Sequence, residues 1–83
     1  MGIGPGGRPS AAEMVETLRK MRRHVEDNAD YVGPRFAEEA RRIHYNESEA
    51  RGIYGEASLE DARELADEGI EAFPMPRLPE DQN

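Results

Sequence analysis

Large apolar side chains are scarce in this sequence, and that scarcity limits what the chain can fold into. Only 36% of the 83 residues are apolar, and many of these are alanines, which add little transfer free energy on burial. A chain of this length forms one domain at most and buries a modest fraction of its surface. Small domains usually depend on disulfides, a metal or a partner. Because there is no cysteine, disulfides and thiolate zinc sites are excluded, which leaves a partner surface or low stability.

The net charge of −7 is concentrated in the last third of the chain. From Arg8 to Arg51 nine basic residues balance nine acidic ones, whereas Gly52–Asn83 holds two basic and nine acidic residues. Such an acidic segment keeps a chain soluble and repels nucleic acid. The sequence contains no signal-peptide core and no apolar run of membrane-spanning length. We therefore expect a cytoplasmic protein with no membrane partner, for which nucleic acid is a disfavoured partner.

Apolar spacing and helix-start signals predict three helices, at about residues 11–28, 34–45 and 59–68. The first helix begins after Ser10, which forms a capping-box signature with Glu13. Its apolar residues then recur every three or four positions, which marks one face of a helix. These residues are Ala11, Met14, Leu18, Met21 and Val25.

Helix-stop signals set the other boundaries. Asn46 suits a left-handed stop after the second helix. Ser58 is the expected cap of the third helix. Gly69 is its expected left-handed end, with Ile70 folding back on Leu65 in a Schellman stop.

The remaining segments are expected to be irregular. Residues 1–9 are rich in glycine and proline, and we expect a disordered leader there. Residues 28–33 indicate a loop. Residues 47–57 are ambiguous between a helical turn and a loop that tucks two apolar side chains inward. We therefore expect an all-α fold, with one small irregular three-helix domain over residues 10–79.

A proline-rich tail follows the third helix. The prolines predict an extended, polyproline-like segment up to Pro79. It is expected to lie across the helices, because Phe73, Met75 and Leu78 have no other way to leave water. Residues 80–83 are expected to fray.

No catalytic, metal-binding or cofactor-binding constellation is recognisable. Gly2–Gly7 matches the glycine spacing of a dinucleotide-binding loop, but no strand precedes it and no room exists for the sheet. His24 and His44 are the only histidines. A metal site needs three or four converging ligands, so we expect no metal, no cofactor and no small-molecule ligand. His44 with Glu47 is the one faint candidate for an enzyme site.

Five arginines on the predicted helices are candidates for contact with a partner: Arg19, Arg22, Arg23, Arg41 and Arg42. A nucleic-acid-binding patch needs such charges free for phosphate. Each of these arginines instead has an acid three or four positions away, where the two side chains can pair. Glu38 and Glu39, for example, are expected to match Arg41 and Arg42. The pattern favours a solvated, ion-paired surface, although a phosphate could still compete for the arginines.

Three tyrosines are further interaction candidates: Tyr31, Tyr45 and Tyr54. All are predicted at helix ends or in loops. Tyrosine is favoured at interfaces because one end of it is apolar and the other polar. The same residues could instead close the edges of a thin core, and the sequence leaves both interpretations open.

Three stretches of the sequence resemble a known family: residues 24–33 (HVEDNADYVG), 36–45 (FAEEARRIHY) and 51–57 (RGIYGEA). The chain is similar, from about Met14 to Pro79, to the C-terminal half of the bacterial domain of unknown function 1178 proteins. Members of that family carry a zinc-ribbon-like N-terminal segment with CxxC pairs. This sequence has none of those cysteines, so no metal ligand carries over. The resemblance implies an excised helical half or a member that starts downstream of the ribbon, and it implies no activity.

The function expected from the sequence is that of a non-enzymatic helical interaction module. Through the resemblance, it is the C-terminal part of a zinc-ribbon regulatory protein. Its expected partner is a second copy, another protein or that ribbon. The alternative is a nucleic-acid-binding accessory domain that uses the arginine-rich helix faces, and an enzyme ranks third.

Overall fold

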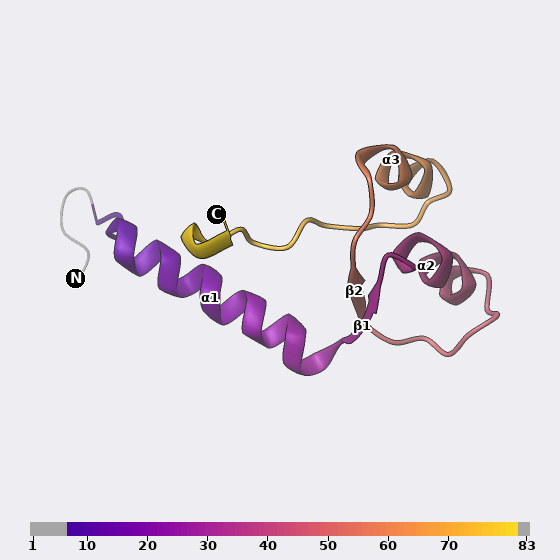
Figure 1. Ribbon diagram of the computed structural model, residues 1–83, viewed down its shortest axis with the longest axis horizontal. Coiled ribbons are helices and arrows are strands. Elements are labelled where there is room, and N and C mark those ends of the chain that lie inside the picture. Colours follow the sequence, from indigo (N-terminus) through magenta and orange to yellow (C-terminus); the bar gives the residue numbers. More distant parts are fainter. Residues whose placement is uncertain (1–6, 82–83) are drawn as a thin grey trace.

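The computed structural model describes residues 7–81. They contain three α-helices and one two-stranded parallel sheet (Figure 1). Most of the expected leader and of the Gly2–Gly7 motif lies outside this range. The predicted all-α class is wrong, because the fold is mixed α/β. In chain order the elements are α1 (Ala11–Asn28), β1 (Asp30–Gly33), α2 (Phe36–His44), β2 (Ile53–Gly55), α3 (Leu59–Asp67) and the 3-10 turn η1 (Pro79–Asp81).

The sheet forms from the loop predicted before α2 and the ambiguous segment after it. β1 and β2 pair in parallel, with Tyr31 opposite Tyr54, and α2 lies in the crossover that parallel strands require. Each strand has only three or four residues, too few to show a recognisable alternation of apolar and polar positions. Val32 and Ile53 favour extended backbone, but only pairing between distant segments turns that tendency into a sheet.

Two glycines let the strands approach each other closely where both end. Gly33 is buried and has a φ of +58°, in the left-handed region. Gly55 lies opposite it in the strand register. A Cβ at position 55 would lie 2.3 Å from the carbonyl oxygen of Gly33, which is far inside van der Waals contact. The sheet therefore excludes any side chain at position 55.

Local hydrogen bonds explain where α1 and α3 begin. The backbone N–H of Glu13 donates to the hydroxyl oxygen of Ser10 at 3.1 Å, and the backbone N–H of Ser10 donates to the Glu13 carboxylate at 2.8 Å. The predicted capping box is therefore confirmed. At the start of α3 the N–H of Asp61 donates to the hydroxyl oxygen of Ser58 at 3.0 Å. Such a cap stabilises a helix by about 1 kcal/mol.

The predicted left-handed residues end α2 and α3. Asn46 has a φ of +62° shortly after α2. Gly69 has a φ of +82° after α3, and the N–H of Ile70 donates to the carbonyl of Leu65 at 2.9 Å. That bond is the longer-range of the two that define a Schellman stop. It returns Ile70 to the apolar side of α3.

The apolar core is small and lies where α2, α3 and β2 meet. Its buried residues are Ala40, Leu65 and Ile70, and Phe36, Ala37 and Ile53 pack against them. Leu65 is fully buried, and burying a leucine side chain stabilises a fold by about 2 kcal/mol. The core therefore holds few large side chains, as the composition predicts.

The C-terminal tail leaves α3, runs back across the molecule and ends beside α1 (Figure 1). Its Leu78 is buried, and Met75 is half-buried. Phe73 is 82% exposed, so the expectation that it leaves water by packing on the helices is wrong. Residues 80 and 81, where we expect fraying, belong to η1 and form ion pairs with α1.

We predict that Gly55→Ala lowers the free energy of unfolding by about 2 kcal/mol, because the new methyl group overlaps the Gly33 carbonyl. Urea unfolding monitored by circular dichroism would measure the change. Gly52→Ala is the matched control, since a Cβ there would meet its nearest atom, the Ala29 Cβ, at 3.4 Å. Equal midpoints for the two variants would contradict the close approach of the strands.

Candidate functional site

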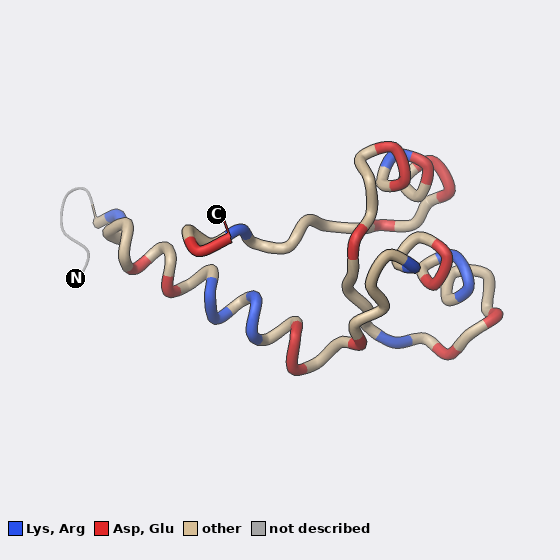
Figure 2. Tube along the Cα trace, viewed as in Figure 1, with Lys and Arg blue, Asp and Glu red and all other residues tan. Residues whose placement is uncertain are grey.

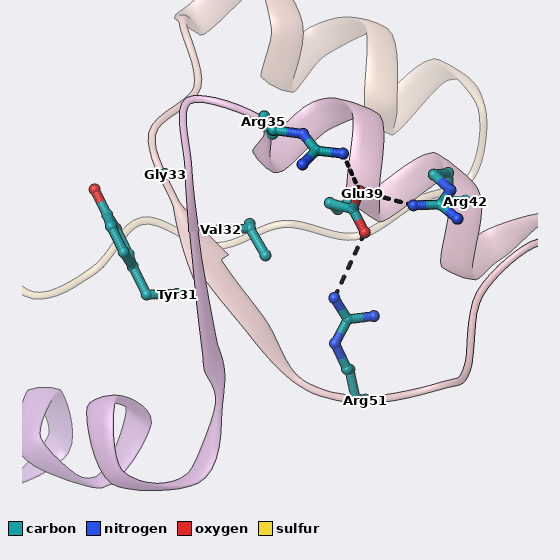
Figure 3. Close-up of a pocket in the computed structure, with 7 residues that line it drawn as sticks. All are labelled: Tyr31, Val32, Gly33, Arg35, Glu39, Arg42 and Arg51. Carbon is teal, nitrogen blue, oxygen red and sulfur yellow. Dashed lines mark hydrogen bonds and ion pairs between the residues drawn. The ribbon is translucent and has the colours of Figure 1, made fainter.

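Three arginines surround a single buried carboxylate, and this is the densest polar cluster among the described residues (Figure 3). Only 7% of the Glu39 side chain is exposed. Arg35 and Arg42 both donate to its Oε2, each at 3.0 Å. Arg51 approaches its Oε1 at 3.5 Å. We call the three side chains of Arg35, Arg42 and Arg51 the arginine ring, with Glu39 at its centre.

Two parts of the chain build the arginine ring. Arg35 is the residue that precedes the first turn of α2, Glu39 lies four residues on and Arg42 three further, so all three share one face of the helix. Arg51 arrives from the segment before β2. Its other donors hold it in place, Nε on Asp30 at 2.9 Å and Nη1 on the hydroxyl of Ser48 at 3.1 Å. The ring therefore ties α2 to the segment that leads into β2.

An open hollow of about 480 Å³ lies beside this cluster. Its lining consists of Tyr31, Val32, Gly33, Arg35, Glu39, Arg42 and Arg51. Three guanidinium groups and one carboxylate give this lining a formal charge of +2. Val32 points toward the arginines, whereas the Tyr31 ring extends away from them on the other side of β1 (Figure 3).

The charges of the ring hold Glu39 in its ionised form. The hydrogen bond from Arg42 lowers the pKa of the Glu39 carboxyl most, and bonds and charges from Arg51 and Arg35 add to that effect. Burial acts in the opposite direction and is outweighed. Glu39 is therefore a fixed negative charge around which the three guanidinium groups are ordered.

The predicted pairing within α2 is only partly present. Arg42 pairs with Glu39 as expected, but Arg41 reaches α3 instead of Glu38. It donates to Glu68 at 2.8 Å, and the Tyr45 hydroxyl donates to the same carboxylate at 3.0 Å. The bond from Arg41 is the main cause of a lowered pKa at Glu68. Arg41 and Tyr45 therefore hold α2 and α3 together.

Two of the three arginines of α1 contact the tail. Figure 2 shows basic residues in the middle of α1 and acidic residues toward both of its ends, with the acidic η1 beside it. Arg19 pairs with Glu80 at 2.8 Å, and Arg22 pairs with Asp81. Within α1, Arg19 lies 3.9 Å from Glu16 and Arg22 3.7 Å from Glu26. Among residues 7–81, Arg23 has no ion pair of its own.

The tyrosines fall into two places. The rings of Tyr31 and Tyr54 lie 5.2 Å apart across the paired strands. The Tyr31 hydroxyl donates to Glu56 at 2.7 Å, and that bond raises the pKa of Tyr31. Tyr45 follows α2 and is bonded to Glu68 beyond α3. The structure therefore brings two of the three candidate tyrosines together and separates the third.

The two histidines lie in separate places, and His44 is close enough to Glu68 to add to the lowering of the pKa of that carboxyl. His24 lies on α1, with its Nδ1 3.3 Å from the side-chain nitrogen of Asn28. His44 ends α2 with its ring edge-on to Tyr45. Among residues 7–81 no three His, Cys, Asp or Glu side chains are grouped to hold a metal ion. The described helices also include none that is long and apolar enough to cross a membrane.

Sequence reasoning misses the centre of this site. Arg35 and Arg51 are not among the predicted interaction residues, and Glu39 is predicted only as a surface partner of the arginines. The spacing of Arg35, Glu39 and Arg42 along one helix face is readable from the sequence. The approach of Arg51 depends on the strand pairing and has no local signal.

We predict that stability falls in acid as the pH drops below about 4.5, the ordinary value for glutamate. The folded state lowers the pKa of Glu13, Glu39, Glu68 and Asp81, so the unfolded state binds protons more readily in that range. Their contribution is complete above the unfolded pKa values and is lost as the pH falls through the folded ones. Urea midpoints between neutral pH and about pH 3 would record this decline.

The Glu39→Gln variant tests how much of this loss of stability in acid comes from the arginine ring. The variant should be less stable than the parent at neutral pH, with a smaller further loss in acid, because it has no charge to neutralise at this position. Glu49→Gln, at an exposed position, is the control and should follow the parent. A pH dependence that is the same in both variants would contradict a role for Glu39.

Comparison with known proteins gives one family and no characterised relative. No curated protein and no solved structure is detectably similar to the chain. Residues 5–80 match one protein family. Because that match extends over nearly the whole sequence, the chain belongs to the family described as "Protein of unknown function (DUF1178)".

Proposed function

We propose that the chain is a non-enzymatic protein-interaction module that associates with a second copy of itself through the apolar stripe of α1. The observation that carries the proposal is that α1, 18 residues long, has no buried residue. Met14 and Met21 are 54% and 52% exposed on it. Helices in folded proteins obtain most of their stability from packing an amphipathic face, and this face is largely uncovered.

The spacing of the stripe suits a paired helix. Its members are Ala11, Met14, Leu18, Met21 and Val25, at alternating intervals of three and four residues. That is the seven-residue repeat with which two helices pack side by side. The tail contacts α1 at Arg19 and Arg22, while both methionines stay exposed. The part of α1 that the tail contacts therefore lies next to the exposed methionines.

The surface of the chain is large for its mass. Its accessible area is 6591 Å², whereas a compact monomer of 9.3 kDa exposes about 5,000 Å². The radius of gyration is 16.3 Å, against about 12 Å for a compact domain of this length. The difference in area exceeds the roughly 800 Å² that each partner buries in a stable interface. This surplus supports association.

Charge does not oppose a pair of α1 helices. The positions that flank the stripe on the side away from the tail are Ser10, Thr17 and His24, none of which is an acidic residue, a lysine or an arginine. The acidic and basic residues of α1 are equal in number and lie mostly on its outer face. A self-complementary, uncharged stripe of this kind favours a second copy as the partner.

The alternative of a nucleic-acid-binding domain has less support. Arg19, Arg22, Arg41 and Arg42 are each engaged with carboxylates, and α3 is acidic. Binding of RNA or DNA would require those pairs to exchange for phosphate, and it would fall steeply with salt. The attachment of the module to a zinc ribbon remains an expectation from the family resemblance.

Sedimentation across a range of concentrations tests the proposal. We expect a monomer–dimer equilibrium, and we expect the double variant Met14→Gln/Met21→Gln to weaken association at least about tenfold, because each glutamine removes exposed apolar area from the stripe. Leu59→Gln is the matched control, since Leu59 is 71% exposed on α3, away from α1. A parent chain that stays monomeric, or a double variant that associates equally well, would refute the proposal.

A further inference from the structure

We propose that the hollow beside the arginine ring binds the phosphate group of a small phosphorylated molecule. This site is separate from the stripe of α1 and does not depend on self-association. The sequence alone predicts no small-molecule ligand.

The donors are close together and partly unused. Arg35 and Arg42 bond the same oxygen of Glu39, so their guanidinium groups are neighbours, and Arg51 faces them across the carboxylate. A guanidinium group has five N–H donors and matches the oxygens of phosphate in pairs. Among residues 7–81, Arg42 forms its ion pair with Glu39 alone. Donors therefore remain for a tetrahedral anion that bridges the ring.

Glu39 prepares the ring for a ligand. Its buried carboxylate draws together three side chains that would otherwise repel one another. It neutralises only one of their charges, which leaves the lining at +2. Because the guanidinium groups are already ordered, an anion that binds there avoids much of the cost of immobilising long side chains.

Two further carboxylates flank the arginine ring and offset part of its positive charge. Glu38 pairs with Arg35 at 3.3 Å, and Asp30 pairs with Arg51 at 2.9 Å. Their side chains are 62% and 68% exposed, so these pairs are solvated and contribute little to stability. A phosphate with several oxygens can compete for the same guanidinium groups, whereas the buried carboxylate of Glu39 stays in place.

The space fits a small molecule better than a nucleic-acid strand. A hollow of about 480 Å³ falls within the range of ordinary ligand pockets, and a second hollow of about 610 Å³ shares Arg35 and Arg42 with it. A ligand held by its phosphate at these two arginines has room for an organic group on either side of them. A long polyanion would be repelled by the net charge of −7 that the chain carries.

Isothermal titration of the full chain with inorganic phosphate at low ionic strength tests the site. We expect saturable binding with one phosphate per chain. Arg42→Gln should weaken it at least about tenfold, and Asp30→Asn should tighten it, because that change removes a carboxylate that competes for Arg51. Arg63→Gln is the matched control, since Arg63 is exposed on α3 and does not line the hollow. Parallel titrations with a phosphomonoester distinguish a ligand with an organic group from free phosphate.

Circular dichroism establishes whether each variant folds, and Arg35→Gln replaces Arg42→Gln if the latter does not. Absence of saturable binding up to about 10 mM phosphate, a range that detects even weak complexes, would overturn the proposal. So would equal losses in the Arg42→Gln and Arg63→Gln variants. The Met14→Gln/Met21→Gln variant should bind phosphate like the parent, which separates failure of this site from failure of self-association.

Discussion

Glu39 interacts with three arginines that come from both sides of the α2 crossover, and the arrangement of α2 against the strands depends on these bonds. A buried carboxylate without partners would be strongly destabilising, so the ion pairs are required once the glutamate lies there. A hydrophobic residue of similar volume could stabilise the same position without any arginine. The fold therefore contains an ionic centre where its small apolar core, at Leu65 and Ile70, does not reach.

The same use of charge recurs at the other contacts between elements. Arg41 and Tyr45 meet Glu68 where α2 packs on α3, and Arg19 and Arg22 meet the tail where η1 lies beside α1. Leu78 is the one buried apolar residue between positions 71 and 81. Ion pairs at exposed surfaces are weak and screened by salt, so α1 and the tail are held less firmly than the α2–α3 core. The molecule has a compact half and a loosely attached half.

Local features of the fold could be predicted from the sequence, and distant ones could not. The capping box at Ser10, the stop at Gly69 and the three helices depend on residues within a few positions of one another. The parallel sheet depends on contact between segments more than twenty residues apart, whose strands are too short to carry their own pattern. The same holds for the site. Helix spacing predicts that Arg35 and Arg42 lie beside Glu39, whereas the position of Arg51 depends on the sheet.

The contact between Arg19 and Glu80 spans 61 positions of the chain, which gives the molecule a fixed order of assembly during synthesis. Of the three helices, α1 leaves the ribosome first, whereas η1, which lies beside it, emerges after all three helices. Until translation passes η1, the nascent α1 lacks the ion pairs that Arg19 and Arg22 form with that segment. Partners that act on unfinished chains, such as chaperones, therefore meet an α1 whose two arginines are not yet paired with η1.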